Sequence, residues 1–133
     1  MKISYCPLLR FAVLAWLGLS IGNAATSAPP PVFVLNSLEA NVSVIDPVTW
    51  TETIRIPTGK EPHHLYLTPD EKSLIVANAL GDTLTFVDPR TAEVQRTVQG
   101  IVDPYHLRFS PDMKWLITAA NRLNHVDFYR WDG

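Results

Sequence analysis

Three histidines stand where short apolar segments begin, and their side chains are the ones in this sequence best suited to chemistry. His63 and His64 occur in "EPHHL", and His106 occurs in "DPYHL". An imidazole ring can ligate a metal ion or a haem iron, and it can act as a general base near neutral pH. We take His63, His64 and His106 as candidate ligand-binding or metal-binding residues. The sequence identifies no catalytic residue and no secure metal site.

A structural role for two of these histidines must be weighed against a functional one. His64 and His106 are 42 positions apart, and a proline two residues earlier, Pro62 or Pro104, recurs with them. A residue that recurs with a structural period is first a structural residue, and its ring nitrogen can hydrogen-bond the backbone of the neighbouring repeat. His63 departs from the period because Tyr105 stands at the equivalent position. His63 is therefore the better functional candidate.

The histidine segments belong to an internal repeat, which determines the elements that must position them. Segment 34–49 aligns without gaps with segment 76–91, and a third copy follows at the same spacing. The copies span residues 32–59, 60–101 and 102–133. The first copy lacks its beginning and the third lacks its end. The pairs that carry the repeat include Pro62 and Pro104, Leu65 and Leu107, Leu74 and Leu116, Ile75 and Ile117, Ala77 and Ala119, and Phe86 and Phe128.

Each copy is expected to consist of short β-strands joined by tight turns. Runs rich in Val, Ile, Leu, Thr, Phe and Tyr predict strands at about 64–68, 73–79, 83–88 and 93–99 in the complete copy. In the turn "LGD", Gly81 is expected to take a positive φ angle. Pro and Asp preset the backbone of β-turns and cap its donors. The predicted turn residues are Pro69, Asp70, Pro111, Asp112, Asp46 and Asp88.

Four short antiparallel strands in roughly 40 to 45 residues form the unit of a β-propeller blade. A β-sandwich has no reason to repeat its sequence, and a parallel β-helix has shorter coils. The predicted fold class is all-β. The chain would form a partial β-propeller of about two and a half four-stranded blades after an N-terminal signal helix.

The motifs "VFVLN", "NVSVIDPVT" and "PHHLYLTPD" resemble the YVTN-type β-propeller repeats of exported bacterial and archaeal proteins. The resemblance covers about residues 32 to 131. One departure is that Glu71 and Met113 stand where that family usually has Gly after "SPD". Relatives usually close a ring of seven blades, so the resemblance implies an N-terminal fragment of a longer protein that is monomeric when complete. Completion of the ring by oligomerisation is the alternative.

Residues 1–24 are expected to form a secretory signal peptide. A basic flank precedes the apolar run "FAVLAWLGLSIG", and small residues and prolines follow it. Cleavage is expected after Ala24, or else after Ala28, with a Pro/Ala-rich linker at 25–31. A retained membrane anchor is the alternative, although the apolar run is shorter than the roughly 20 residues that span a bilayer. The expected location is the periplasm or the exterior.

Charge and cysteine content exclude several kinds of partner and site. The formal net charge is -2 with no basic run, so neither nucleic acid nor, after cleavage, a membrane is expected as a partner. The only cysteine, Cys6, lies in the predicted signal peptide. The mature chain would therefore form no disulfide, thiolate zinc site or iron–sulfur cluster. His125 is expected to be a surface residue.

Two functions from different classes fit this sequence. The first is an exported binding or scaffold module that holds a protein or a small molecule at one face of the propeller and requires no cofactor. The second follows from the resemblance alone, which extends to lactonase-like hydrolases, haem-carrying nitrite-reductase-like domains and amine-dehydrogenase-like propellers. In that case His63, His64 and His106 would contribute to a haem or metal site completed by other blades. The fold by itself does not decide between them.

Overall fold

The computed structural model describes residues 29–132, which form three antiparallel β-sheets. The predicted signal peptide and most of the predicted linker lie outside the described residues. Between residues 29 and 132, no helix is long and apolar enough to cross a membrane. The elements are β1 (Val32–Asn36), the short 3-10 helix η1 (Ser37–Glu39), β2 (Asn41–Ile45), β3 (Glu52–Pro57), β4 (Pro62–Leu67), β5 (Leu74–Asn78), β6 (Thr83–Val87), β7 (Val94–Gln99), β8 (Pro104–Phe109), β9 (Trp115–Ala120) and β10 (His125–Arg130).

Each sheet follows chain order, so every strand pairs with its sequence neighbour. The first sheet is β1-β2-β3, the second is β4-β5-β6-β7, and the third contains β8, β9 and β10. The predicted strands of the complete copy agree with β4 to β7 to within two residues at each end. Only the second sheet has four strands among the described residues. The prediction of an all-β, partial propeller is thus confirmed.

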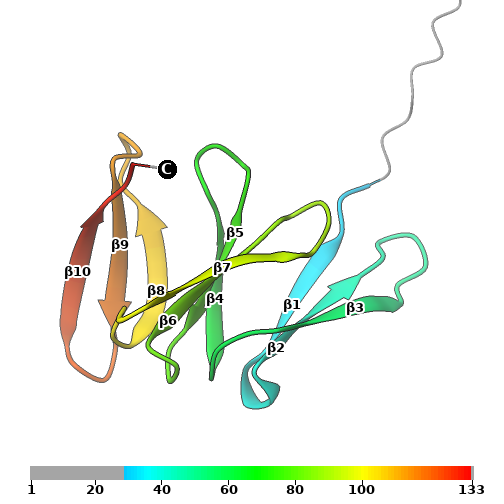
Figure 1. Ribbon diagram of the computed structural model, residues 1–133, viewed down its shortest axis with the longest axis horizontal. Helices are drawn as coiled ribbons and strands as arrows, with labels where there is room; N and C mark the ends of the chain where they lie inside the picture. Colours follow the sequence, from blue (N-terminus) through cyan, green and yellow to red (C-terminus); the bar gives the residue numbers. More distant parts are fainter. Residues whose placement is uncertain (1–28, 133) are drawn as a thin grey trace, which may run out of the picture.

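The three sheets stand side by side like consecutive blades, as Figure 1 shows. The first strand of the second sheet, β4, contacts both β8 and β1. Each of these three strands lies at one edge of its sheet, and we call them the inner strands. The strands β3, β7 and β10 lie at the opposite edges. Side chains near the start of β4 and β8 are thereby brought together.

Two apolar cores hold the sheets to one another. Alternate side chains of a strand point to opposite faces, so one sheet can pack against two neighbours. Ile75 and Phe86 of the second sheet pack toward Leu107 and Leu116 of the third. The opposite face of the second sheet, with Val76 and Val87, packs against the first sheet through Val42, Val44 and Ile56.

The turns repeat the sequence period in their backbone conformation. Positive φ angles occur at Ala40, Asp82 and Asn124, which are equivalent positions of the three copies, and at the equivalent pairs Trp50 and Ala92, Glu61 and Asp103, and Glu71 and Met113. The prediction for "LGD" was wrong, because Asp82 and not Gly81 takes the positive φ, at 50°. Asp tolerates this region better than most residues, and Gly81 is needed there for space instead.

The aspartates expected in turns cap backbone donors in the structure. Asp46 Oδ1 accepts hydrogen bonds from the N–H groups of Val48 (2.7 Å) and Thr49 (3.0 Å). Asp88 does the same for Arg90 and Thr91. These bonds hold the pKa of both carboxyl groups below the usual range. Asp70 and Asp112, which follow Pro69 and Pro111, each accept from a hydroxyl group and from the backbone N–H of a lysine.

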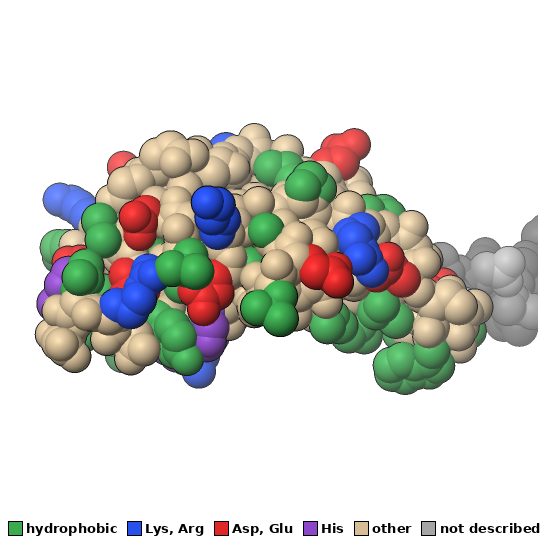
Figure 2. All heavy atoms as spheres, turned by 90° about the horizontal axis from the view of Figure 1, so that it is seen from below, with side chains coloured by type: hydrophobic (Ala, Val, Ile, Leu, Met, Phe, Trp, Pro, Cys, Tyr) green, Lys and Arg blue, Asp and Glu red, His purple; other side chains and the backbone are tan. Residues whose placement is uncertain are grey.

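One end of the array carries the β1-β2, β5-β6 and β9-β10 turns, at the bottom of Figure 1. Figure 2 views the molecule from this side, and it shows basic and acidic side chains next to one another with apolar side chains between them. Neither positively nor negatively charged side chains predominate on this face. The distribution agrees with the even spread of charge along the sequence.

Candidate functional site

The candidate histidines lie at the start of the inner strands β4 and β8, in a local irregularity that both strands share. Pro62 pairs with Asn78 and His64 with Ala77, so His63 has no partner on β5. The same shift occurs between Pro104 and His106, which leaves Tyr105 unpaired. A β-bulge of this kind twists the strand and re-aims the extra side chain.

The shared bulge brings four rings from the two strands together. The rings of His63 and Tyr105 are stacked, with centroids 3.6 Å apart and an interplanar angle of 29°. The rings of His64 and His106 are 3.9 Å apart and tilted by 50°. We call these four residues the inner-strand cluster. The structure thus unites all three predicted candidates and adds Tyr105 to them.

Two further side chains extend the cluster along the same strands. The guanidinium carbon of Arg108 lies 5.1 Å from the centre of the Tyr66 ring, a distance suited to a cation–π contact. Arg108 is exposed and makes no ion pair within residues 29–132. Nothing in the sequence singled it out, because its counterpart in the second sheet is Tyr66.

His64 has an electrostatic environment that keeps its ring neutral. Partial burial, together with the nearby His106, Arg108 and His63, lowers the pKa of His64 from 6.5 to about 4. The Nδ1 atom of His64 is buried and has no hydrogen-bond partner in the described part of the chain. Near pH 7 the ring therefore carries no charge and retains unused hydrogen-bonding capacity.

The inner-strand cluster can supply several kinds of contact to a ligand. The rings supply aromatic surface, the neutral His64 ring supplies hydrogen-bonding atoms, and Arg108 supplies one positive charge. In residues 29–132, no group of three or more His, Cys, Asp or Glu side chains is arranged to hold a metal ion. A general base is commonly oriented by a hydrogen-bonding partner, and His64 Nδ1 has none among these residues.

His125 lies away from the cluster, at the start of β10. Its side chain is 44% exposed, and its Nε2 atom lies 3.0 Å from Asp127 Oδ2. This contact agrees with the expected surface position. The turn residues Asp46, Asp70, Asp88 and Asp112 bond to their own turns and contribute nothing to the cluster.

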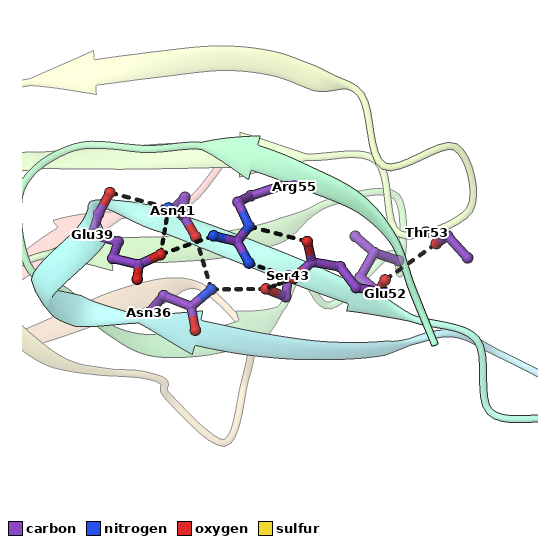
Figure 3. A network of polar contacts seen from close by, with 8 residues as sticks. Asn36, Glu39, Asn41, Ser43, Glu52, Thr53 and Arg55 are labelled. Carbon is purple, nitrogen blue, oxygen red and sulfur yellow. Dashed lines mark hydrogen bonds and ion pairs between the residues drawn. The ribbon is translucent and has the colours of Figure 1, made fainter. Parts of the chain in front are cut away.

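A polar network on the first sheet was not expected from the sequence. Arg55 pairs with Glu39 (2.9 Å) and Glu52 (2.8 Å), and Glu52 also accepts a hydrogen bond from Ser43. Asn36 Nδ2 donates to Asn41 and Ser43. Figure 3 shows these side chains over the strands β1 to β3. Arg55 and then Ser43 hold the pKa of Glu52 below its usual range.

Part of this network is a feature of the repeat. In the second sheet, Asn78 Nδ2 donates to Thr83 Oγ1 (3.0 Å) and Thr85 Oγ1 (2.9 Å). These three residues are the repeat equivalents of Asn36, Asn41 and Ser43. We call the two hydrogen bonds that one Asn side chain donates the Asn fork. The Asn78 fork in the second sheet is buried, and the equivalent fork in the first sheet is partly exposed. The sequence signal that could have revealed these hydrogen bonds is an Asn that recurs at the end of a strand, followed after the turn by two polar residues.

A buried carboxylate links the second and third sheets. Asp103 accepts hydrogen bonds from the backbone N–H of Arg122 (2.6 Å) and from its Nε (3.0 Å), and the Arg122 guanidinium also donates to the Ala79 carbonyl. Burial tends to raise the pKa of Asp103, but the contacts with Arg122 outweigh it and lower the pKa. These contacts hold the turns in place and occupy both oxygens of the carboxylate.

Comparison with known proteins identifies related sequences and folds. The profile of the YNCE-like beta-propeller family matches residues 6–133. No curated protein matches the chain. The matching family is described as YNCE-like, so this comparison does not confirm the expected YVTN-type assignment.

Several solved structures share the fold. Kuenenia stuttgartiensis hydrazine synthase is 23% identical with a TM-score of 0.64, and the match covers 77% of this chain and 30% of that one. The dihydro-heme d1 dehydrogenase NirN, in complex with DHE, is 18% identical with a TM-score of 0.60, over 76% of this chain and 22% of that one. A protein provisionally named a 6-phosphogluconolactonase, from Bacteroides uniformis, is 18% identical with a TM-score of 0.58, over 75% and 32%. The chain thus spans about a third or less of the length of these structures, and at such identities they show the fold alone.

Proposed function

The chain belongs to the YNCE-like beta-propeller family, and we propose that it serves as an exported binding module whose inner strands hold a small ligand. The observation that carries the proposal is the convergence of rings from two blades at 3.6 and 3.9 Å in the inner-strand cluster. Rings that are stacked in advance lose little conformational freedom when a ligand binds. His63, the histidine outside the repeat period, is part of the stacked pair.

Two features of the cluster support a ligand that is partly polar. The buried Nδ1 of His64 has no partner among residues 29–132, and a ligand donor or acceptor could satisfy it. Arg108 supplies a positive charge beside Tyr66. A ligand with a flat apolar part and a polar or anionic edge would use both features.

Export rests on the N-terminal sequence, whose apolar run is short and is followed by small residues. A mature chain that begins at Ala25 is the expected product. N-terminal sequencing of protein recovered from the periplasm tests this directly. Recovery of an unprocessed chain in the membrane fraction would favour the alternative of a retained anchor.

A second candidate function is a part in a haem-dependent, metal-dependent or hydrolytic enzyme. The observation in its favour is the gathering of His63, His64 and His106, because a ring whose pKa is about 4 can ligate iron near neutral pH without competition from protons. NirN forms a complex with DHE, and this is a property of NirN. A bound haem or metal would supply redox chemistry, and the imidazoles would furnish only part of its ligands, because no group of three or more such side chains in residues 29–132 is arranged to hold a metal ion.

One experiment separates the two functions and tests the site. The full chain is expressed with its own N-terminal segment, purified from the periplasm, and analysed by absorption spectroscopy, metal analysis and mass spectrometry for a co-purified small molecule. The binding-module proposal predicts a co-purified molecule without haem bands or stoichiometric metal. Haem bands or bound metal would favour the second candidate.

Variants locate the signal. His63→Ala with His64→Ala should abolish the bound molecule, whereas His125→Ala, at an exposed histidine outside the cluster, should leave it unchanged. Circular dichroism shows whether each variant keeps its sheets. A signal that survives in the folded double variant would remove the inner-strand cluster as the site.

A further inference from the structure

An open groove of about 490 Å³ lies between the first and second sheets, and none of its lining residues belongs to the inner-strand cluster. Its size is within the range of small-molecule sites, roughly 300–1,000 Å³. We call it the hydroxyl groove, after the threonines of β6 and β7 that form one wall. The lining residues are Pro57, Thr58, Gly59, Lys60, Leu80, Gly81, Thr83, Thr85, Thr97 and Gln99.

Two buried hydroxyl groups in the groove have unused protons. Thr83 and Thr85 each accept a hydrogen bond from Asn78 Nδ2, and neither donates its own proton to an acceptor among residues 29–132. A hydroxyl group can donate once and accept twice. Both hydroxyls can therefore donate to a ligand without losing the bonds that hold them.

Most other polar side chains of the groove also have donors without partners. Thr97, Gln99 and Lys60 make no side-chain hydrogen bond or ion pair within residues 29–132. Thr58 is different, because its hydroxyl donates to the Gly59 carbonyl at 3.2 Å. Lys60 is the one charged residue in the described lining, which contains no carboxylate.

The glycines of the groove are required by close approach of the backbone. A Cβ atom on Gly59 would lie 2.6 Å from Thr83 Oγ1 and 2.8 Å from Asn78, and one on Gly81 would lie 2.9 Å from the backbone nitrogen of Lys60. Real Cβ atoms do not come so close to their neighbours. The turns that contain Gly59 and Gly81 can therefore pack this closely only because glycine has no side chain.

The hydroxyl groove departs from the repeat. At the equivalent positions of the next junction, Ile101 replaces Gly59, Val102 replaces Lys60 and Asp127 replaces Thr85. Ile101 is buried in the core between the second and third sheets. The repeated hydrogen bonds from Asn account for Thr83 and Thr85. Lys60 has the apolar Val102 at its equivalent position, so the repeat does not explain its positive charge.

We propose that the hydroxyl groove binds an oxyanion group, such as a phosphate, a sulfate or a phosphorylated small molecule. Lys60 supplies the compensating charge, and the hydroxyls of Thr83, Thr85 and Thr97 donate hydrogen bonds to the anionic oxygens. Charge-assisted hydrogen bonds of this kind are about twice as strong as neutral ones. A lining that offers donors and one cation, without a carboxylate, selects an anion over a neutral polyol.

The test is calorimetric titration of the full chain with inorganic phosphate and with sulfate at low ionic strength. Saturable binding is expected. Lys60→Met should weaken it at least about tenfold, and Thr97→Val about threefold, because each removes one donor. Both residues are exposed, so neither change disturbs the core. Lys72→Met is the matched control, since it removes an exposed lysine outside the groove.

The outcomes bear on this groove and are independent of the inner-strand cluster. Equal weakening by Lys72→Met would show non-specific attraction to charge and would overturn the proposal. Binding that is unchanged in Lys60→Met and Thr97→Val, or the absence of saturable binding, would also overturn it. Glucose serves as a neutral probe, and affinity for glucose equal to that for phosphate would identify a polyol groove instead.

Discussion

His64 is the residue whose chemistry the structure changes most. Partial burial and the neighbouring His106, Arg108 and His63 lower its pKa to about 4. The Tyr66 ring also stacks beside it, with centroids 6.4 Å apart. His64 is thus a neutral hydrogen-bonding group across the physiological range, which is the property that the proposed binding role requires.

The lowered pKa makes stability depend on pH in a defined window. The folded-state pKa of His64 is about 4 and its ordinary value is 6.5, so the unfolded chain binds the proton more readily between these values. Stability should therefore fall as the pH is lowered from about 6.5 toward 4. Replacing His64 by Phe, which keeps a neutral ring, should remove this part of the loss.

Chemical denaturation at several pH values measures the effect. His125→Phe is the control, because His125 is exposed and paired with Asp127, and the loss on acidification should remain in that variant. NMR titration of the His64 ring gives the pKa itself. A midpoint at the ordinary value of 6.5 would contradict the environment described for this residue.

Among single residues, the sequence predicted the candidates and missed their partners. The departure of His63 from the period pointed to a special position, and the structure shows it stacked on Tyr105, its own counterpart in the next copy. Arg108 and the donors of the hydroxyl groove escaped prediction because Arg, Thr and Gln are common on exposed strands. Which of these side chains line the same site depends on how two sheets pack against each other, and this is visible only in the structure.

Among the strands and turns, the positive φ angles show how each blade is built from the same turns. Glu71 and Met113 have φ angles of 57° and 59°, at the positions where the resembling family usually has Gly. The left-handed conformation costs an L-residue about 1–2 kcal/mol. Glu71 and Met113 are therefore two of the strained positions in this chain.

Replacing Glu71 or Met113 by Gly should stabilise the chain. Relief of the strain exceeds the entropic cost of Gly, so each change should raise the free energy of unfolding by about 0.5–1 kcal/mol. Lys114→Gly, in the same turn but without a positive φ, should lower it by a similar amount. Urea denaturation of the three variants measures the difference. Destabilisation by all three would show that the turns do not have this conformation.

The strands could be predicted because alternation and the repeat period reinforce one another. The turn conformations and the β-bulges were harder to predict from the sequence. Gly81 was expected to take the positive φ that Asp82 takes, since Gly is the usual residue there. The bulges at His63 and Tyr105 depend on pairing with β5 and β9, which no single segment encodes.

Across the three sheets, equivalent residues have different surroundings according to which sheet they occupy. Phe86 is 2% exposed between the second and third sheets, its ring stacked with Trp131 and covered by the Arg96 guanidinium. Phe128 occupies the same repeat position in the third sheet and is 63% exposed. Burial in a propeller is thus provided by the neighbouring blade and not by the sheet itself.

The pair Phe86 and Phe128 provides an internally controlled test of this arrangement. Phe86→Ala should cost about 3–5 kcal/mol of unfolding free energy, the usual effect of a large truncation in a core. Phe128→Ala should cost less than about 1 kcal/mol, as expected for an exposed site. Thermal or urea unfolding of the full chain compares the two. Equal losses would mean that the sheets do not pack in this order.

The proposed site exists only if the inner strands of successive blades bring rings from two copies of the repeat into one binding surface. The nuclear Overhauser effect between ring protons of His64 and His106 in the full chain reports this contact. The structure, with ring centroids 3.9 Å apart, predicts a strong cross-peak, and a second one between His63 and Tyr105. Sharp, assigned ring signals without either cross-peak would show that the two strands do not meet in this way.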